Sequence, residues 1–102
     1  QIIAVTAKRN LQEIPKGFFM TLPPSFALAL VAVTGHQMQE HSLVQEHILE
    51  TLQRVGVTVL GLTSCTQSIT VLVSDQDAEV SVRSLHRRFF GEKIDTSKYL
   101  TT

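Results

Sequence analysis

The stretch ALALVAVTGHQM, residues 27–38, decides the fold of this 102-residue chain. Its first seven residues are all apolar and are followed by Thr34-Gly35, a pattern typical of a buried strand that ends in a turn. A strand with helices on one face only should alternate apolar and polar residues, because its other face meets water. This stretch does not alternate. We therefore expect a sister domain or a second copy of the chain to cover its other face, unless the small apolar residues simply tolerate partial exposure.

A helix is predicted directly after this strand, from about residue 42 to residue 54. Ser42 and Gln45 have the spacing of a capping box, in which two side chains satisfy free backbone donors at a helix start. Gly56 suits the end of the helix. The apolar positions at helical spacing are Val44, Ile48, Leu52 and Val55.

A hairpin and a second helix follow. Residues 57–64 and 68–74 have the composition of two strands, and only three residues separate them. Ser74 or Asp75 can cap a helix that ends at Gly91. The apolar stripe of this helix comprises Ala78, Val82, Leu85 and Phe89.

The two ends of the chain complete the pattern. Residues 1–10 contain a β-branched strand, 2–7, while residues 11–25 hold all three prolines and are interpreted as a linker or the remnant of an inserted domain. Residues 26–91 form the main domain, and residues 92–102 are expected to be a C-terminal tail.

The order of these elements predicts an α+β fold. A ferredoxin-like unit has the order β-α-β-β-α-β and places both helices on one face of a four-stranded antiparallel sheet. Here a strand is missing after the second helix, and an additional strand precedes the first one. We therefore expect a circular permutation in which the N-terminal strand completes the sheet as its edge.

Composition limits the classes of partner. The chain has nine basic and nine acidic residues, so its net charge of +0 gives no reason to expect nucleic acid or a membrane surface as a partner. The apolar run 26–33 is about half as long as a membrane-spanning helix requires, and no signal peptide is recognisable. The single cysteine, Cys65, excludes an internal disulfide and favours a cytoplasmic location.

Several segments, taken together, resemble the C-terminal ACT regulatory region of aspartate kinases. The resemblance covers about residues 27–90 together with 2–10, and its order and spacing are more specific than any single motif. The matching segments are LALVAVTGHQM at 28–38, Gly56-Val57-Thr58-Val59, Asp77-Ala78-Glu79 and Leu85-His86-Arg87-Arg88-Phe89-Phe90.

This resemblance also implies an origin for the permutation. Aspartate kinases carry two ACT domains, one inserted into the other, so the strand before the insertion completes the sheet of the second domain. Residues 11–25 are far too few for a complete inserted domain, although PKGFFM at 15–20 faintly resembles part of one. The kinase domain, and with it ATP and magnesium, is absent, so the resemblance implies that this chain has no catalytic residue or cofactor of its own.

The resemblance implies allosteric feedback control by an amino acid, with lysine or threonine as possible effectors, and a homo-oligomer formed through ACT sheets. ACT domains bind amino acids at the turn between the first strand and the first helix, where free N–H groups and the helix dipole attract a carboxylate. The residues expected to contact the effector are Met38, His41, Ser42, Thr63, Ser64 and Cys65.

Other interpretations of these residues remain open. The turn can be a plain capped connection, since Glu40-His41-Ser42 replaces the Pro-Gly of many effector-binding members, and Ser and Thr are common turn formers. The domain would then only pair subunits. The ACT portion of a fused aspartate kinase–homoserine dehydrogenase is a further alternative.

Metal, thiolate and RNA chemistry receive little support. The four histidines, His36, His41, His47 and His86, lack metal-ligand spacing and are expected at the surface. Cys65 has no cationic neighbour in the sequence that would make it a reactive thiolate. The predicted hairpin lacks the aromatic residues of an RNA-binding sheet, and the arginines near Gly91 suit the end of a helix.

Overall fold

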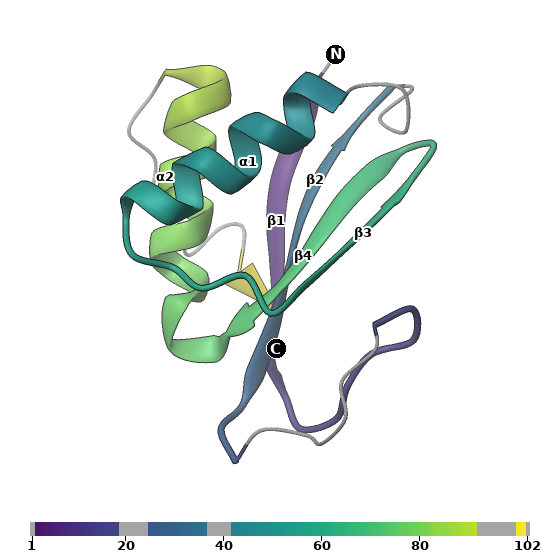
Figure 1. Cartoon of the computed structure of the whole chain (residues 1–102), viewed down its shortest axis with the longest axis vertical. Coiled ribbons are helices and arrows are strands. Elements are labelled where there is room, and N and C mark those ends of the chain that lie inside the picture. The colour runs from purple at the N-terminus through teal and green to yellow at the C-terminus, as the bar shows by residue number, and fades with distance from the viewer. Residues whose placement is uncertain (1, 19–24, 37–41, 92–99, 102) are drawn as a thin grey trace.

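The computed structural model describes residues 2–18, 25–36, 42–91 and 100–101. Within these residues, five strands, two α-helices and one 3-10 turn follow one another (Figure 1). Their order and bounds are β1 Ile2–Leu11, β2 Leu28–Gly35, α1 Ser42–Arg54, β3 Gly61–Cys65, β4 Ser68–Ser74, η2 Asp75–Asp77, α2 Ala78–Phe90 and β5 Leu100–Thr101.

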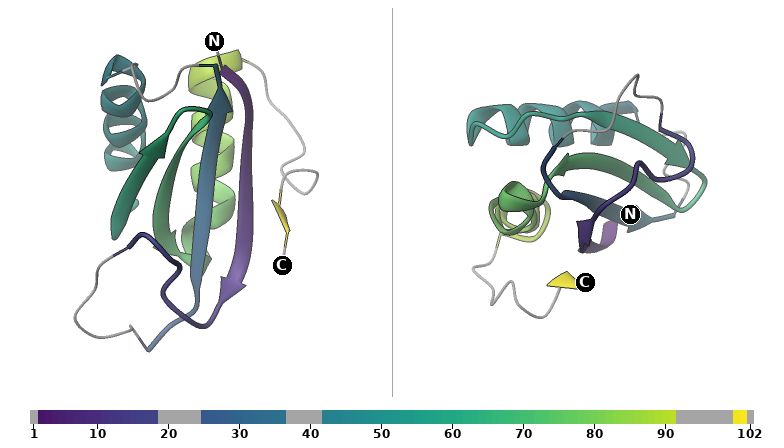
Figure 2. Two further views of the ribbon diagram at one scale, coloured as in Figure 1. Left: turned by 90° about the vertical axis from the view of Figure 1, so that its right-hand side faces the viewer. Right: turned by 90° about the horizontal axis from the view of Figure 1, so that it is seen from below.

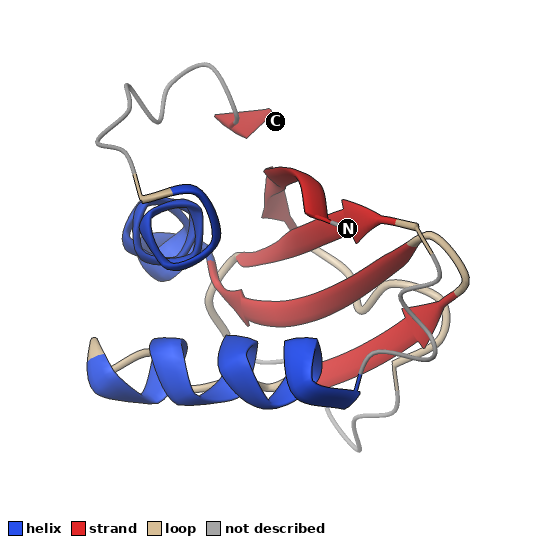
Figure 3. Ribbon diagram, turned by 90° about the horizontal axis from the view of Figure 1, so that it is seen from above, coloured by secondary structure: helices blue, strands red, loops and turns tan. Residues whose placement is uncertain are grey.

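The sheet has the strand order β3-β4-β2-β1-β5. The pairs β3–β4, β4–β2 and β2–β1 are antiparallel, and β1 joins β2 from Ile2 opposite Gly35 to Leu11 opposite Leu28. Both helices cover the same face of the sheet, as Figures 2 and 3 show. The predicted α+β fold and the permutation, with the N-terminal strand completing a four-stranded antiparallel sheet, are therefore confirmed.

The two ends of the chain differ from the sequence-based expectation. Strand β1 continues through Lys8, Arg9 and Asn10, which were expected to end it, and Asn10 takes a φ of 59° at an irregularity in the pairing with β2. Strand β1 is also not the edge, because β5 pairs with it in parallel. Residues 92–99 of the expected tail lie outside the described residues, whereas Leu100–Thr101 extend the sheet along the free backbone groups of β1.

The hairpin and the first helix need smaller corrections. Strand β3 begins only at Gly61, although Leu60 already donates a backbone hydrogen bond to Leu72 O at 2.7 Å. Helix α1 has the predicted bounds, but Val55 lies beyond its last turn and is 42% exposed.

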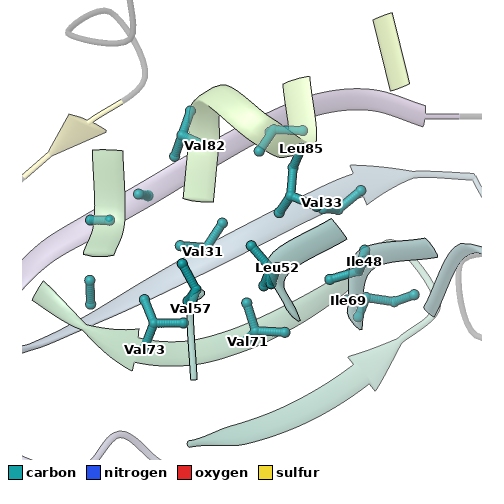
Figure 4. Packing of buried hydrophobic residues seen from close by; sticks show 14 residues of the cluster. Val31, Val33, Ile48, Leu52, Val57, Ile69, Val71, Val73, Val82 and Leu85 are labelled. Carbon is teal, nitrogen blue, oxygen red and sulfur yellow. The ribbon is translucent and has the colours of Figure 1, made fainter. Parts of the chain in front are cut away.

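Alternate residues of three strands build the core against the helices. Val31 and Val33 of β2 lie beside the inward residues of β1 and β4 (Figure 4). The two helices cover this layer with four residues, which are Ile48 and Leu52 of α1 and Val82 and Leu85 of α2. Because side chains alternate across a strand, the residues between them point to the opposite face of the sheet.

The end of α1 is fixed by a Schellman motif. Gly56, in the left-handed region at φ 79°, donates to Gln53 O at 3.1 Å, and Val57 donates to Leu52 O at 2.9 Å. The motif is often accompanied by an apolar contact between the residues that flank it, and both Leu52 and Val57 belong to the core. The glycine predicted to end the helix therefore also directs the chain back into the core.

Helix α2 starts differently from the prediction. Neither Ser74 nor Asp77 makes a side-chain capping hydrogen bond, and Asp75 lies in the preceding 3-10 turn. The Asp75 carboxylate instead accepts hydrogen bonds from Arg9 Nη2 at 3.0 Å, Arg9 Nε at 3.2 Å and the Asn10 backbone N–H at 2.7 Å. The expected capping role is wrong because this carboxylate ties the start of α2 to the far end of β1.

The Arg9–Asp75 pair makes stability depend on pH. The hydrogen bond from Arg9 is the main cause that holds the pKa of the Asp75 carboxyl below its ordinary value of 3.8. A folded-state pKa below the unfolded one means that the pair stabilises fully above about pH 5 and that this contribution is lost as the pH falls through the folded-state pKa. Replacing Asp75 with asparagine should therefore lower the free energy of unfolding by about 1–2 kcal/mol at pH 7.

Urea unfolding at pH 7 and at pH 3 measures this contribution. The difference between the wild type and Asp75→Asn should shrink at pH 3, because the Asp75 carboxyl of the unfolded chain, with its ordinary pKa of about 3.9, is then largely protonated and the unfolded state is favoured. The exposed pair Glu50–Arg54 offers a matched control: Glu50→Gln removes one carboxylate from a pair whose side chains are 52% and 77% exposed, and it should change stability little. A cost for Asp75→Asn that is the same at both pH values would contradict this role of the pair.

The face of the sheet opposite the helices is partly covered by the chain itself. A Cβ built on Gly61 would lie 2.6 Å from Phe18 Cδ1, so Phe18 lies directly against this face at β3. The neighbouring position on β4 is Leu72, which pairs with Gly61 and is fully buried. The segment 12–18, which returns beside β3 in Figure 1, therefore supplies some of the cover that was expected from another domain or copy.

The remainder of this face is less well covered. Leu30 and Ala32 of β2 are half-buried, and Thr6 and Lys8 of β1 are exposed. We call the surface formed by Ala4, Thr6, Lys8, Leu30, Ala32, Thr34 and Thr70 the open face. Its centre is apolar and its rim is polar.

Candidate functional site

A hollow of about 390 Å³ lies where β2 ends beside the turn of the β3–β4 hairpin. Gly35 ends β2, and its backbone N–H donates to Gln67 O in the hairpin turn at 2.9 Å. This bond holds the two turns together on either side of the hollow. The lining residues are Ile3, Thr34, Gly35, His36, Cys65, Gln67 and Ser68.

The walls of the hollow are fixed by further hydrogen bonds. Thr34 Oγ1 donates to the Ala4 carbonyl at 3.3 Å, which ties the end of β2 to β1. Cys65 Sγ lies 3.2 Å from Ser68 Oγ across the last pair of residues of the hairpin. Thr34, Cys65 and Ser68 are therefore held at defined positions by regular strands.

Ile3 forms the apolar rim of the hollow. An irregularity in the β1–β2 pairing lies between Ile2 and Ala4, so Ile3 has no Cα partner in the register and its side chain is 58% exposed. Irregularities of this kind re-aim a side chain near the end of a strand. An exposed large apolar residue beside a polar hollow is suited to contact a ligand or a second protein surface.

The thiol of Cys65 is influenced by its neighbours. A hydrogen bond with Ser68, followed by the backbone N–H groups of Gln67 and Ser68, lowers the pKa of the exposed Cys65 thiol. All the causes that lower this pKa are hydrogen bonds from the hairpin turn itself. Hydrogen bonds that favour a thiolate would equally favour another anionic or polar acceptor at this position.

The predicted contact residues are distributed over more than one place. Cys65 lines the hollow, whereas Thr63 lies against the segment 12–18, with its Cγ2 3.6 Å from a Cβ built on Gly17. Ser64 and Ser42 are exposed and do not line the hollow, and Ser42 is the first residue of α1. Met38 and His41 lie outside the described residues.

Most residues of the hollow were not among the predicted contacts. Ile3 and Thr34 come together only through the register of β1 and β2, which the sequence does not state. Gln67 and Ser68 could have been inferred from the hairpin, because the residues next to its turn are brought to the same end of the sheet as Gly35.

The chemistry of the hollow is that of hydrogen bonding. Two hydroxyls, one side-chain amide, one thiol and His36 face an apolar rim, and among the described residues no arginine, lysine or carboxylate lines the hollow. Its volume lies within the range of small-molecule sites. The hydroxyl and side-chain amide groups of these residues are donors that a ligand carboxylate could use. Among the described residues no group of His, Cys, Asp and Glu could hold a metal ion.

The histidines are placed partly as expected. His36 is exposed, but His86 is only 8% exposed and its ring lies 4.6 Å from that of Phe90 at 45°. The surface position predicted for His86 is wrong, because the buried side of α2 is wider than the predicted stripe. The residues of α2 that are buried comprise Ala78, Ser81, Val82, Leu85 and His86.

A family model of the ACT domain matches residues 31–89. The chain belongs to the ACT domain family. The match begins in β2 and ends in α2, so it contains the hairpin and both helices but not β1. The fold places β1 in the sheet position that the family unit otherwise fills from its C-terminal end.

The domain is similar in structure to parts of solved regulatory subunits of aspartate kinase. It is similar to the ligand-free subunit from Thermus thermophilus, with a TM-score of 0.58, 19% identity and coverage of 61% of this chain and 42% of that one. The subunit from Thermus flavus gives a TM-score of 0.59, 19% identity and coverage of 62% and 41%. A structure of aspartokinase alpha and beta subunits gives a TM-score of 0.57, 26% identity and coverage of 61% and 42%.

These likenesses concern a part of each subunit. The chain spans about two fifths of the length of the structures that it matches. No curated protein matches its sequence. Within the part of the chain that the structure describes, no helix is long and apolar enough to cross a membrane.

Proposed function

We propose that this chain is a regulatory ACT domain of an aspartate kinase, the enzyme that phosphorylates L-aspartate in the first step of lysine, threonine and methionine biosynthesis. In this proposal the domain pairs with a second ACT domain and transmits feedback control by an amino acid. The kinase activity itself belongs to another region of the parent protein. The family match and the likeness to aspartate kinase regulatory subunits support this assignment.

The observation that carries the proposal is the hollow at the end of β2. It lies beside the strand-to-helix connection at which ACT domains bind effectors, and its hydroxyl, amide and apolar groups suit a small zwitterion. The α-carboxylate would lie near the connection and the start of α1, where the helix dipole favours negative charge. The side chain of the effector would then point towards Cys65 and Ser68.

A pairing role without any ligand is the second candidate. The N–H of Gly35 is already bonded to Gln67 O at 2.9 Å, so this amide is not free to bind a carboxylate. The half-buried apolar centre of the open face and the exposed Ile3 favour contact with another protein surface. Pairing through the sheet is therefore part of both candidates, and only the effector distinguishes them.

Thermal melting in the presence of amino acids separates the two candidates. At concentrations well above the dissociation constant, an effector that binds the folded state raises the melting temperature by mass action. We expect millimolar lysine or threonine to raise it, and we expect Ser68→Phe, which fills the hollow, to remove the rise. Ser25→Phe, at an exposed position away from the hollow, is the matched control.

The outcomes have different meanings for the two candidates. If lysine, threonine and methionine all leave the melting curve unchanged, the sensor function is wrong and the pairing function remains. A rise that persists in Ser68→Phe would place the effector elsewhere on the domain. The assignment to an aspartate kinase has a separate test, which is whether a kinase domain is encoded in the same polypeptide.

A further inference from the structure

A second hollow, of about 410 Å³, lies on the far side of the molecule, between the two helices. Helix α1 crosses beside α2 in Figure 1, and the two helices contact one another. The hollow is lined by Thr51, Arg54, Val55, Arg83, Ser84, Arg87 and Arg88. We call it the arginine groove. It shares no residue with the hollow at the end of β2.

The arginine groove concentrates the positive charge of a neutral chain. Four of the five arginines of the sequence line it, although the chain as a whole has nine basic and nine acidic residues. They come from two helices, so the groove depends on how the helices pack and not on the sequence of one helix. Cations in the last turn of a helix complement its dipole, which accounts for Arg54 at the end of α1 and for Arg87 and Arg88 at the end of α2. This effect does not account for Arg83 in the middle of α2 or for the meeting of both helix ends in one groove.

The arginines are available to a ligand. Arg54 pairs with Glu50 at 2.9 Å and Arg83 with Glu79 at 2.6 Å, and the side chains of both pairs are more than half exposed. Exposed pairs of this kind contribute little, so a multivalent anion can compete with them. Arg87 and Arg88 take part in no ion pair among the described residues.

We propose that the arginine groove binds a phosphate-bearing small molecule. Guanidinium groups donate two parallel hydrogen bonds to phosphate oxygens, and a phosphate ester carries close to two charges with three acceptor oxygens at neutral pH. Donors that approach from two helices suit the tetrahedral arrangement of these oxygens better than a planar carboxylate. The hydroxyls of Thr51 and Ser84 add donors, and Val55 offers an apolar surface to the rest of the ligand.

The proposal is independent of the amino-acid site. A phosphate-bearing metabolite at the helix layer would be a second input to the same domain. Its site uses the last turn of α1, whereas none of the residues that line the hollow at the end of β2 belongs to α1. If the experiment on one site contradicts its proposal, the proposal for the other site is unaffected.

Titration calorimetry of the full chain with pyrophosphate and with adenosine monophosphate tests the proposal, at an ionic strength of about 0.15 M so that diffuse attraction is screened. The two probes distinguish recognition of the phosphate groups alone from recognition of a nucleotide. The test variant is Arg87→Gln combined with Arg88→Gln. The matched control is Lys16→Glu, which lowers the net charge by the same two units at an exposed position outside the groove.

We expect saturable binding of at least one probe, weakened about tenfold by the arginine variant and unchanged by the lysine variant. The proposal is overturned if neither probe binds at millimolar concentration. It is also overturned if the arginine variant and the lysine variant weaken binding equally, which would indicate attraction by overall charge. Equal binding of citrate would show that the groove recognises multivalent charge and not phosphate, and would overturn the assignment of the ligand.

Discussion

Replacing Leu52 with alanine is expected to lower the free energy of unfolding by about 3 kcal/mol, the largest stability effect among the changes considered for this domain. Leu52 is fully buried in the core between α1 and the sheet. Truncation removes apolar contacts and leaves a cavity that the fixed strands cannot close. Small domains are stable by only about 5–15 kcal/mol, so this loss is a large share of the total.

Leu52 also closes the end of its helix. Its carbonyl accepts the hydrogen bond from Val57, and the two side chains belong to the same core cluster. Loss of this packing should loosen the return of the chain towards β3 as well as the helix itself. Urea unfolding followed by circular dichroism measures the change in free energy directly.

Leu49 on the same helix provides the control. Its side chain is 36% exposed, and Leu49→Ala removes the same atoms from a position outside the core cluster. We expect a loss below about 1 kcal/mol for this variant. Equal losses for Leu52→Ala and Leu49→Ala would contradict the packing of α1 on the sheet that the structure shows.

Replacing Ala32 with lysine is expected to weaken self-association by about 30-fold or more. Ala32 lies at the apolar centre of the open face, opposite Thr6 of β1 and Thr70 of β4. In the proposed pairing this face is covered by a second domain, and a lysine there would have to lose water or hold the two surfaces apart. A cost of about 2 kcal/mol for an unpaired charge in an interface corresponds to a factor of about 30 in the dissociation constant.

Sedimentation equilibrium over a range of protein concentrations measures this change. The matched control is Gln53→Lys, which adds the same charge at an exposed position of α1, away from the open face. The wild type and the control should associate alike, while Ala32→Lys should remain a monomer at concentrations where they pair. If the wild type is a clean monomer at high micromolar concentration, pairing of this domain with itself is ruled out.

The sequence was sufficient for the fold because its signals were local and agreed with one another. Each local pattern predicts which element packs or pairs beside it: the unbroken apolar strand, the amphipathic helices and the short hairpin. A four-stranded sheet with a permuted N-terminal strand is the arrangement that accommodates them all. The glycine at 56 had a local role that could be stated in advance, and its left-handed conformation is the one that a helix end requires.

The residues whose roles were predicted wrongly make contacts with distant parts of the chain. Asp75 was expected to cap a helix, but it binds Arg9, which is 66 residues away. Phe18 belongs to a segment interpreted as a linker, yet it lies against Gly61 and shields the sheet. Such pairings follow from the order of strands, and nothing in the local sequence signals them.

The candidate site was predictable only in its general place. The connection after β2 and the hairpin turn were expected to meet, and Cys65 does line the hollow between them. Ile3 and Thr34 enter through the register of β1, while Thr63 lies away from the hollow, against the segment 12–18. A shift of one residue in a strand exchanges its two faces, which is why strand residues are the hardest part of such a site to predict.

The most direct test of the regulatory function is amide chemical-shift mapping of the isotope-labelled chain during titration with lysine, threonine and methionine. An effector in the hollow should shift the amides of Gly35, His36, Gln67 and Ser68 in a saturable manner, with one dissociation constant common to all of them. Amides of the arginine groove should move much less. If none of the three amino acids shifts these four amides at millimolar concentration, the domain does not sense an amino acid at this site.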